Sequence, residues 1–216
     1  MANAVAVALG SVVSLWRYPV KSMMGEELNA TDVTERGLLG DRAYALVDTS
    51  DGKAATAKNP RKWPGLFDFR AAFAEPVRPG ARVPSVRLVL PDGTTVTSQQ
   101  GDLNQILSKA LNREVTLRAA QHGAVTAEEY WPDLEGLDHR DTVTDFTLPE
   151  GTFFDIGMVH LLTTATLDRR TSSIRKAASR SGGFVQTSSC NRAQARKALR
   201  RTPGSATRSP SGQRCA

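Results

Sequence analysis

The chain has 216 residues, of which 40% are hydrophobic, so it is long enough for one domain or two small ones and apolar enough to bury a core. No apolar run approaches the roughly 20 residues that cross a bilayer, and the first residues lack the pattern of an export signal, so we expect a cytoplasmic protein without a membrane partner. The net charge of +6 suggests an anionic partner, but residues 1–168 carry 16 Lys and Arg against 22 Asp and Glu, whereas residues 169–216 carry 12 against none.

Short runs of β-branched residues separated by turn formers dominate the chain up to about residue 121. The runs that we expect to form strands are 12–20, 42–48, 67–74, 86–90, 94–98 and 115–120. The dipeptides Asp51-Gly52 and Asp92-Gly93 lie between such runs, where a tight turn needs residues that tolerate positive φ.

One helix interrupts this pattern. The stretch "DLNQILSKALN" begins at Asp102, a plausible cap, and places its apolar residues on one face. The sequence therefore predicts a mainly β fold with some α structure (α+β), whose first domain is a β-barrel over residues 5–121.

The second part of the chain changes in character twice. Residues 122–152 are polar and rich in turn formers, and we expect a linker or long loop there. Residues 153–168 predict an apolar strand that runs into a helix capped by Thr163 or Thr164, as the start of an incomplete second β-rich domain. Residues 169–216 are rich in Ser, Arg, Ala, Gly and Pro, and we expect this basic tail to be disordered.

The cysteines and histidines show no metal-binding pattern. Cys190 and Cys215 lie in the tail without ligand spacing, and His122 and His139 are likewise isolated. His160 lies between apolar residues, so we expect a hydrogen-bonded core histidine there.

Three motifs each couple a turn to a cation: "RYPVKSMMGEEL" (17–28), "GLLGDRAYALVD" (37–48) and "TAKNPRKWPGL" (56–66). Lys21, Ser22 and Arg42 belong to the first two, and an ammonium, a hydroxyl and a guanidinium that converge can bind a phosphate. The third motif adds further cations, Lys58, Arg61 and Lys62. A cation beside a turn is more often a solvated surface residue, so residue type alone does not establish a site.

In this order, "YPVKS", "G…GDR.Y.LVD", "TAK.PR" and "F.D…HLLTTATL" resemble the MOSC family, named for the C-terminal domain of molybdenum cofactor sulfurases, over roughly residues 7–168. The layout is similar to bacterial relatives of the mitochondrial amidoxime reducing component. The resemblance implies an N-terminal β-barrel domain followed by a MOSC domain, with a molybdenum-pterin cofactor. It places Lys21, Ser22 and Arg42 near the pterin and phosphate, and it carries over Asp155 as a further cofactor-binding residue.

The same resemblance implies features that the sequence lacks after "TTATL", namely an R-F-R-P-N-like motif and a molybdenum-ligating Cys in its family context. Reading the tail from the third base of the Arg170 codon permits "HELHPQGRLEVRRLRPNLVVQ" over residues 170–191, which contains a close match to that motif. We therefore hypothesise a one-base shift near residues 168–170, which makes the MOSC domain truncated and the tail out of frame. No catalytic or metal-ligating residue is assigned, and we expect this chain to be inactive and not to retain the cofactor.

Three functions follow from these observations. The first is a molybdenum-dependent oxidoreductase that reduces N-hydroxylated compounds, which in its intact form needs a small-molecule substrate and an electron donor. The second is a non-catalytic module that binds an anion or cofactor, or carries sulfur. The third is nonspecific nucleic-acid binding by the basic tail, which the lack of interleaved aromatic residues makes the weakest of the three, so no specific nucleic-acid partner is expected.

Overall fold

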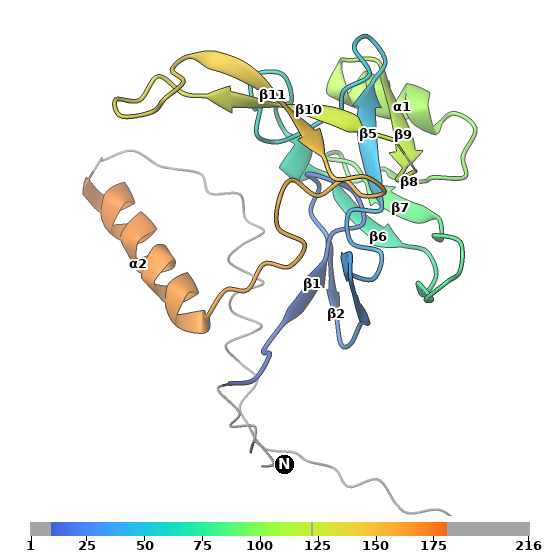
Figure 1. Cartoon of the computed structure of the whole chain (residues 1–216), viewed down its shortest axis with the longest axis horizontal. Coiled ribbons are helices and arrows are strands. Elements are labelled where there is room, and N and C mark those ends of the chain that lie inside the picture. Colours follow the sequence, from blue (N-terminus) through green and yellow to red (C-terminus); the bar gives the residue numbers. More distant parts are fainter. Residues whose placement is uncertain (1–9, 122, 181–216) are drawn as a thin grey trace, which may run out of the picture. The chain divides into compact units, whose positions relative to one another are not determined.

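The structure is a computed structural model that describes residues 10–121 and 123–180 (Figure 1). Ser14–Leu161 forms one compact unit, here called the barrel unit, and the helix α2 (Thr164–Arg180) belongs to a second unit. The barrel unit consists mainly of short strands with one α-helix, so the expected α+β, mainly β fold class is confirmed.

The strands pair antiparallel in short ladders. The pairs are β1 (Leu15–Arg17) with β2 (Glu26–Leu28), β3 (Val33–Thr34) with β4 (Gly37–Leu38), β5 (Tyr44–Asp48) with β9 (Val115–Ala119), and β10 (Val125–Trp131) with β11 (Thr142–Leu148). A three-stranded sheet contains β6 (Arg70–Phe73), β7 (Val86–Val89) and β8 (Thr95–Thr97). A 3-10 helix (Leu66–Asp68) precedes β6, and α1 (Leu103–Leu111) packs against β9.

Single β-bridges join these ladders. The chain after β1 bridges to β5 through Val20 and Tyr44, and to β6 through Met24 and Arg70. Ala54 bridges both to β5 and to β10. The stretch between β1 and β2, which contains Lys21 and Ser22 of the first cationic motif, is thereby fixed between two sheets.

The expected strands up to residue 121 each overlap an observed strand, and both expected turns are present. Gly52 and Gly93 have φ of 73° and 86°, values that glycine adopts without steric cost. The helix α1 lies where it was predicted, although the side chain of Asp102 makes no capping hydrogen bond. At its other end Asn112 adopts a left-handed conformation and its N–H bonds to the carbonyls of Lys109 and Ser108.

Two hydrophobic clusters lie on the two sides of β5. The larger includes Leu46 together with residues of the sheets and of α1. The smaller contains Ala45, Ala54, Ala127, Leu148 and Phe153. Successive residues of a strand face opposite sides, so Ala45 and Leu46 separate the two clusters.

The long loop expected over residues 122–152 is instead largely a β-hairpin, because β10 and β11 lie within it. Ala127 and Leu148 are buried on one face, whereas the adjacent residues Glu128 and Thr147 point the other way. The polar composition that suggested a loop comes from the exposed face and from the segment 132–141. The two strands extend from the rest of the unit as a long ribbon (Figure 1).

The segment 149–163 contains no strand, so the strand expected after residue 153 is absent. Phe153 and Phe154 are buried, but Ile156 and Leu161 are 88% and 85% exposed, which shows that the apolar run does not continue into a sheet. His160 is exposed, contrary to the expectation of a core histidine.

The helix α2 corrects the expectation that disorder begins at residue 169, because residues 169–180 are helical. The Thr163 hydroxyl caps it by accepting a hydrogen bond from the Thr166 N–H at 3.1 Å, which confirms the first of the two predicted caps. The remainder of the predicted disordered tail, 181–216, lies outside the described residues, as do Cys190, Cys215 and His122. Across residues 10–121 and 123–180, no helix has both the length and the apolar character to cross a membrane.

Candidate anion-binding site

Lys21 lies in the turn between β1 and β2, with its N–H bonded to the Tyr44 carbonyl at 2.8 Å. Its side chain is only 4% exposed. The ammonium donates a hydrogen bond to the Phe153 carbonyl at 3.1 Å and forms an ion pair with the Oδ1 atom of Asp155. A residue of the first motif is thereby in contact with a segment more than 130 positions away in the sequence.

Arg42 lies beside this segment. Its N–H bonds to the Tyr18 carbonyl, and its own carbonyl accepts a hydrogen bond from the Phe153 N–H at 3.2 Å. The guanidinium lies over the rings of Tyr18 and Phe154, at 4.6 and 5.4 Å from their centroids, and pairs with Asp41. Lys21 and Arg42 therefore hold the backbone of one residue, Phe153, through its carbonyl and its N–H respectively.

The third motif contributes Lys58. The Ser22 hydroxyl accepts a hydrogen bond from the Ala57 N–H at 3.0 Å, which fixes the loop that carries Lys58. The Lys58 Nζ lies 2.9 Å from the Glu129 Oε2 and 3.6 Å from the Asp155 Oδ2. We call Lys21, Arg42 and Lys58 the cation cluster.

Burial and mutual charge perturb these groups. Burial lowers the pKa of Lys21, the Asp155 carboxylate raises it, and the positive charges of Lys58 and Arg42 lower it further. For Lys58, burial favours the neutral amine, but Glu129 and Asp155 outweigh burial and raise the pKa. Burial also raises the pKa of Asp41, against the opposing charge of Arg42. The lysines of the cluster are partly desolvated, so their pKa values depend on the anions beside them.

The four residues that the resemblance assigned, Lys21, Ser22, Arg42 and Asp155, thus meet at one place: Lys21 contacts Asp155 directly, Arg42 contacts the same segment through Phe153, and Ser22 anchors the Lys58 loop. Their role in binding a cofactor stays a prediction. Sequence reasoning singled out Lys58 among several cations but missed Glu129.

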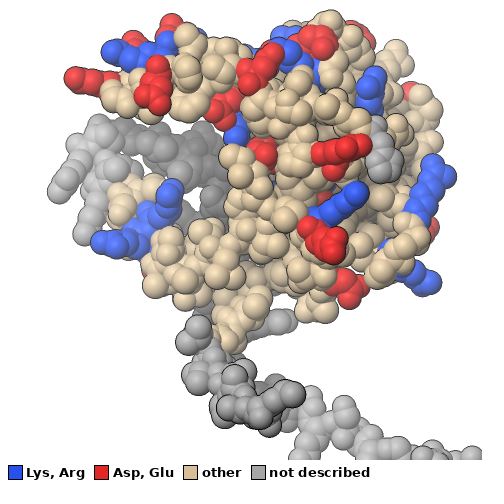
Figure 2. Space-filling view, in the orientation of Figure 1, with Lys and Arg blue, Asp and Glu red and all other residues tan. Residues whose placement is uncertain are grey.

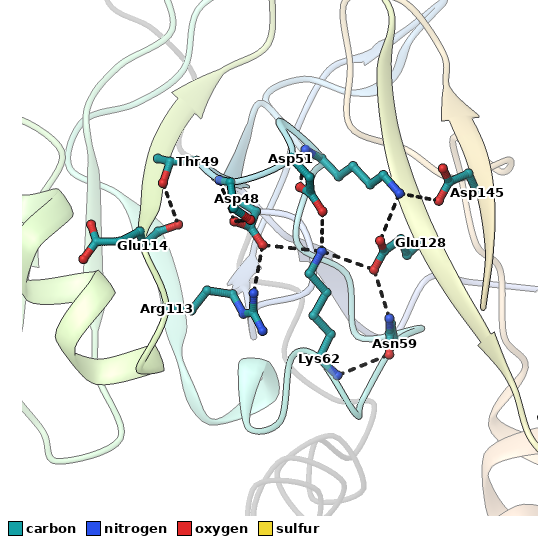
Figure 3. A network of polar contacts seen from close by, with 11 residues as sticks. Asp48, Thr49, Asp51, Asn59, Lys62, Arg113, Glu114, Glu128 and Asp145 are labelled. Carbon is teal, nitrogen blue, oxygen red and sulfur yellow. Dashed lines mark hydrogen bonds and ion pairs between the residues drawn. The ribbon is translucent and has the colours of Figure 1, made fainter. Parts of the chain in front are cut away.

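Arg61 and Lys62 have other partners, although they come from the same motif as Lys58. Arg61 pairs with Asp141 at 2.8 Å and lies 3.9 Å from the centroid of the Tyr130 ring. Lys62 contacts the carboxylates of Asp48, Asp51 and Glu128, as Figure 3 shows. Glu128 and Glu129 are neighbours in β10 and point to opposite faces, so they recruit Lys62 and Lys58 to different sides of the hairpin.

Lys62 belongs to an extended ion network (Figure 3) that connects β5, the loop after it and the hairpin. Asp48 also pairs with Arg113 at 3.2 Å, and Lys53 pairs with Glu128 and Asp145 at 3.0 and 2.7 Å. The ion pairs of this network therefore link β5 and the loop after it to both strands of the hairpin.

The surface gives little support for a nucleic-acid site on the barrel unit. Figure 2 shows blue and red side chains interspersed over the visible face, without a continuous basic area. Polyanion binding to a folded surface relies on clustered Lys and Arg. The visible face of the barrel unit therefore offers no footprint of that kind.

Lys21 lies close enough to Lys58 and Arg42 for their charges to lower its pKa, and ammonium and guanidinium groups of this kind fit the phosphate end of a pterin cofactor. Across the described residues, no group of three or more His, Cys, Asp or Glu is arranged to hold a metal ion.

The family model described as the MOSC N-terminal beta barrel domain matches residues 9–146. This range contains Lys21, Ser22, Arg42 and Lys58, whereas Asp155 lies beyond it. No curated protein matches the chain.

Proposed function

The chain belongs to the MOSC N-terminal beta barrel domain family, and on this premise we propose that its cation cluster binds the phosphate group of a molybdenum-pterin cofactor. The observation that carries the proposal is the convergence of Lys21, Arg42 and Lys58 around the segment 153–155, although they come from three separate motifs. Solvated surface cations from separate loops are not expected to contact one short segment in this way.

Each residue has a distinct part in this binding. Arg42 can make a two-pronged contact with phosphate oxygens, and the two lysines supply point charges. The Ser22 hydroxyl already accepts a hydrogen bond from Ala57, so its own hydrogen remains available to donate to a phosphate oxygen. When bound, a molybdenum centre supplies redox chemistry, while the protein orients the cofactor.

We further propose that this chain does not turn over a substrate and does not retain the cofactor through purification. The support comes from the sequence, in which neither an R-F-R-P-N-like motif nor a Cys in its family context follows "TTATL". In an intact relative, the corresponding site would serve a cytoplasmic oxidoreductase with an N-hydroxylated substrate and an external electron donor. Stoichiometric molybdenum in the purified chain, measured by mass spectrometry, would show this part of the proposal to be wrong.

Phosphate binding can be tested with phenyl phosphate, titrated calorimetrically into the full chain. We expect measurable binding by the wild type and its loss in the double variant Lys21→Ala/Arg42→Ala. Circular dichroism and thermal unfolding must show that this variant is folded, because Lys21 is buried. Binding that survives in the folded double variant would rule out the cation cluster as the site.

A further inference from the structure

Asp155 occupies the point where the two ammoniums of the cation cluster meet. Its Oδ1 atom pairs with the Lys21 Nζ, and its Oδ2 atom lies 3.6 Å from the Lys58 Nζ. A carboxylate whose two oxygens face two different cations has the arrangement that two oxygens of a bound phosphate would adopt.

Asp155 is held less firmly than the other carboxylates of the site. Asp41 has a side chain only 4% exposed and accepts a hydrogen bond from the Tyr18 N–H at 2.7 Å. Glu129 lies within the paired strand β10. Asp155 instead lies in the irregular segment 149–163, and 32% of its side chain is exposed.

The backbone around Asp155 is anchored more firmly before this residue than after it. Phe153 and Phe154 are buried, and Phe153 is bonded to both Lys21 and Arg42. Directly after Asp155, Ile156 is 88% exposed and Gly157 is half-buried. Residues 158–161 are exposed, although the Met158 carbonyl packs against Gly37. The Asp155 carboxylate can therefore leave the lysines by a local movement that keeps the two phenylalanines in place.

The charges of the site make this movement necessary when an anion binds. Asp41, Glu129 and Asp155 contact the three cations of the cluster, so the formal charges of this group cancel. An anion gains net attraction only where one carboxylate withdraws into water, where its charge is screened. Burial lowers the pKa of Lys21 and an anion beside it raises that pKa, a part that either Asp155 or a bound phosphate can fill.

We propose that Asp155 is an internal anion that competes with the phosphate for Lys21 and Lys58, and that a bound phosphomonoester displaces it and releases the segment 155–161. This inference rests on the proposed function of the cluster. It adds that Asp155 and a phosphate cannot contact Lys21 and Lys58 at the same time. The affinity for phosphate is therefore set partly by the Asp155 carboxylate.

The first experiment compares phenyl phosphate with benzenesulfonate, which also carries three oxygens on a tetrahedral centre but a single charge. Titrations at pH 7.5 use the full-length wild type, Asp155→Asn and the control Asp145→Asn. Asp145 is 54% exposed and pairs with Lys53, away from the cluster, so the control makes the same change of charge. The Asn side chain keeps an oxygen that can accept a hydrogen bond from Lys21.

Direct competition predicts that Asp155→Asn tightens the binding of both ligands by a similar factor, about tenfold or more, because the same carboxylate must leave in each case. Asp145→Asn should bind as the wild type does. Repulsion through space alone would instead favour the doubly charged phenyl phosphate much more than benzenesulfonate. Unequal gains of that kind, unchanged binding or weaker binding in Asp155→Asn would overturn the inference.

A second measurement needs no variant. The ¹⁵N order parameters of residues 155–161 should fall when phenyl phosphate binds to the wild type, while those of β5 stay high. Unchanged or higher order parameters in this segment would contradict the displacement. If phenyl phosphate binds in a Lys21-dependent manner but these tests fail, only the inference falls; if it does not bind at all, the proposed function falls with it.

Discussion

Asp48 has the lowest exposure of the charged residues in the described chain, and its carboxylate depends on several partners at once. Ser50 donates to Oδ1 from both its N–H and its hydroxyl, at 2.9 and 2.6 Å. Arg113 and Lys62 contact Oδ2. Burial favours the protonated acid, but the hydrogen bonds from Ser50 and the charge of Lys62 outweigh it, so the pKa of Asp48 lies below its ordinary value of 3.8.

This lowered pKa predicts acid sensitivity. A carboxyl whose pKa is lower in the folded state stabilises the fold fully above its unfolded pKa, and the stabilisation is lost as the pH falls through the folded value. The difference in unfolding free energy between the wild type and Asp48→Asn should therefore be constant above about pH 5 and shrink below pH 4. Denaturant unfolding between pH 3 and 7 measures it, and a difference independent of pH across that range would refute the assignment.

Gly37 is restricted in two ways, since its φ is 85° and an added Cβ would lie 2.5 Å from the Met158 carbonyl oxygen. Gly52 has a similar φ of 73° but open space around it. Gly52→Ala should lower the unfolding free energy by about 1 kcal/mol through backbone strain alone. Gly37→Ala should lower it by at least about 1 kcal/mol more, because the backbone at Met158 must also move. Equal losses in chemical denaturation would show that residues 37 and 158 do not pack as described.

At the level of elements, the two faces of the hairpin β10–β11 contact different groups of charged residues. Glu129 on one face pairs with Lys58 of the cation cluster. Glu128 on the other face accepts hydrogen bonds from Lys53 and Asn59 and pairs with Lys62. The ion network therefore holds the strand that positions one carboxylate of the candidate site.

Removing the charge of Glu128 tests this role. Glu128→Gln leaves Lys62 with fewer partners and should lower the unfolding free energy by about 1 to 3 kcal/mol. The matched control Glu27→Gln, which makes the same change at an exposed position of β2, should cause a smaller loss. The hydrogen-exchange protection of β10 should fall in Glu128→Gln and not in the control. Equal losses in the two variants would argue against the network as an anchor of the hairpin.

The elements differ in how well the sequence could predict them. Strands such as β5 and β7 contain Val together with Leu, and Tyr in β5, next to clear turns, and this local pattern is enough to find them. The strands β10 and β11 carry Glu, Asp and Thr whose partners lie in distant loops, so local polarity indicated a loop. Ala, Leu, Arg and Lys in α2 favour a helix, but the composition of the whole tail concealed it.

The site was predictable to the extent that its residues lie in motifs. Lys21, Ser22 and Arg42 stand in short, distinctive stretches, and their family likeness brought them together before any geometry was known. The contacts with Phe153 and Glu129 depend on tertiary pairing across the chain, which a single sequence does not encode locally. For the same reason, the sequence did not show that Lys58 and Lys62 have partners on different sides of the hairpin.

For the molecule as a whole, the hypothesis of a one-base shift near residues 168–170 is testable at the level of DNA. The uneven charge and the "LRPN" stretch that the shifted frame permits both favour it. Resequencing the gene should find an in-frame MOSC continuation in the shifted frame. If the shifted frame contains no such continuation, the tail belongs to the protein as it stands, and the account of its charge must be replaced.

The central claim is that the cation cluster binds a phosphate group. The most direct test compares two alanine substitutions in one loop, one of a lysine and one of an arginine. Lys58→Ala and Arg61→Ala remove the same charge three positions apart, but only Lys58 contacts Asp155. Calorimetric titration with phenyl phosphate should show at least about tenfold weaker binding for Lys58→Ala and an affinity close to the wild type for Arg61→Ala. Equal affinities for the two variants, whether both weakened or both unchanged, would contradict the account.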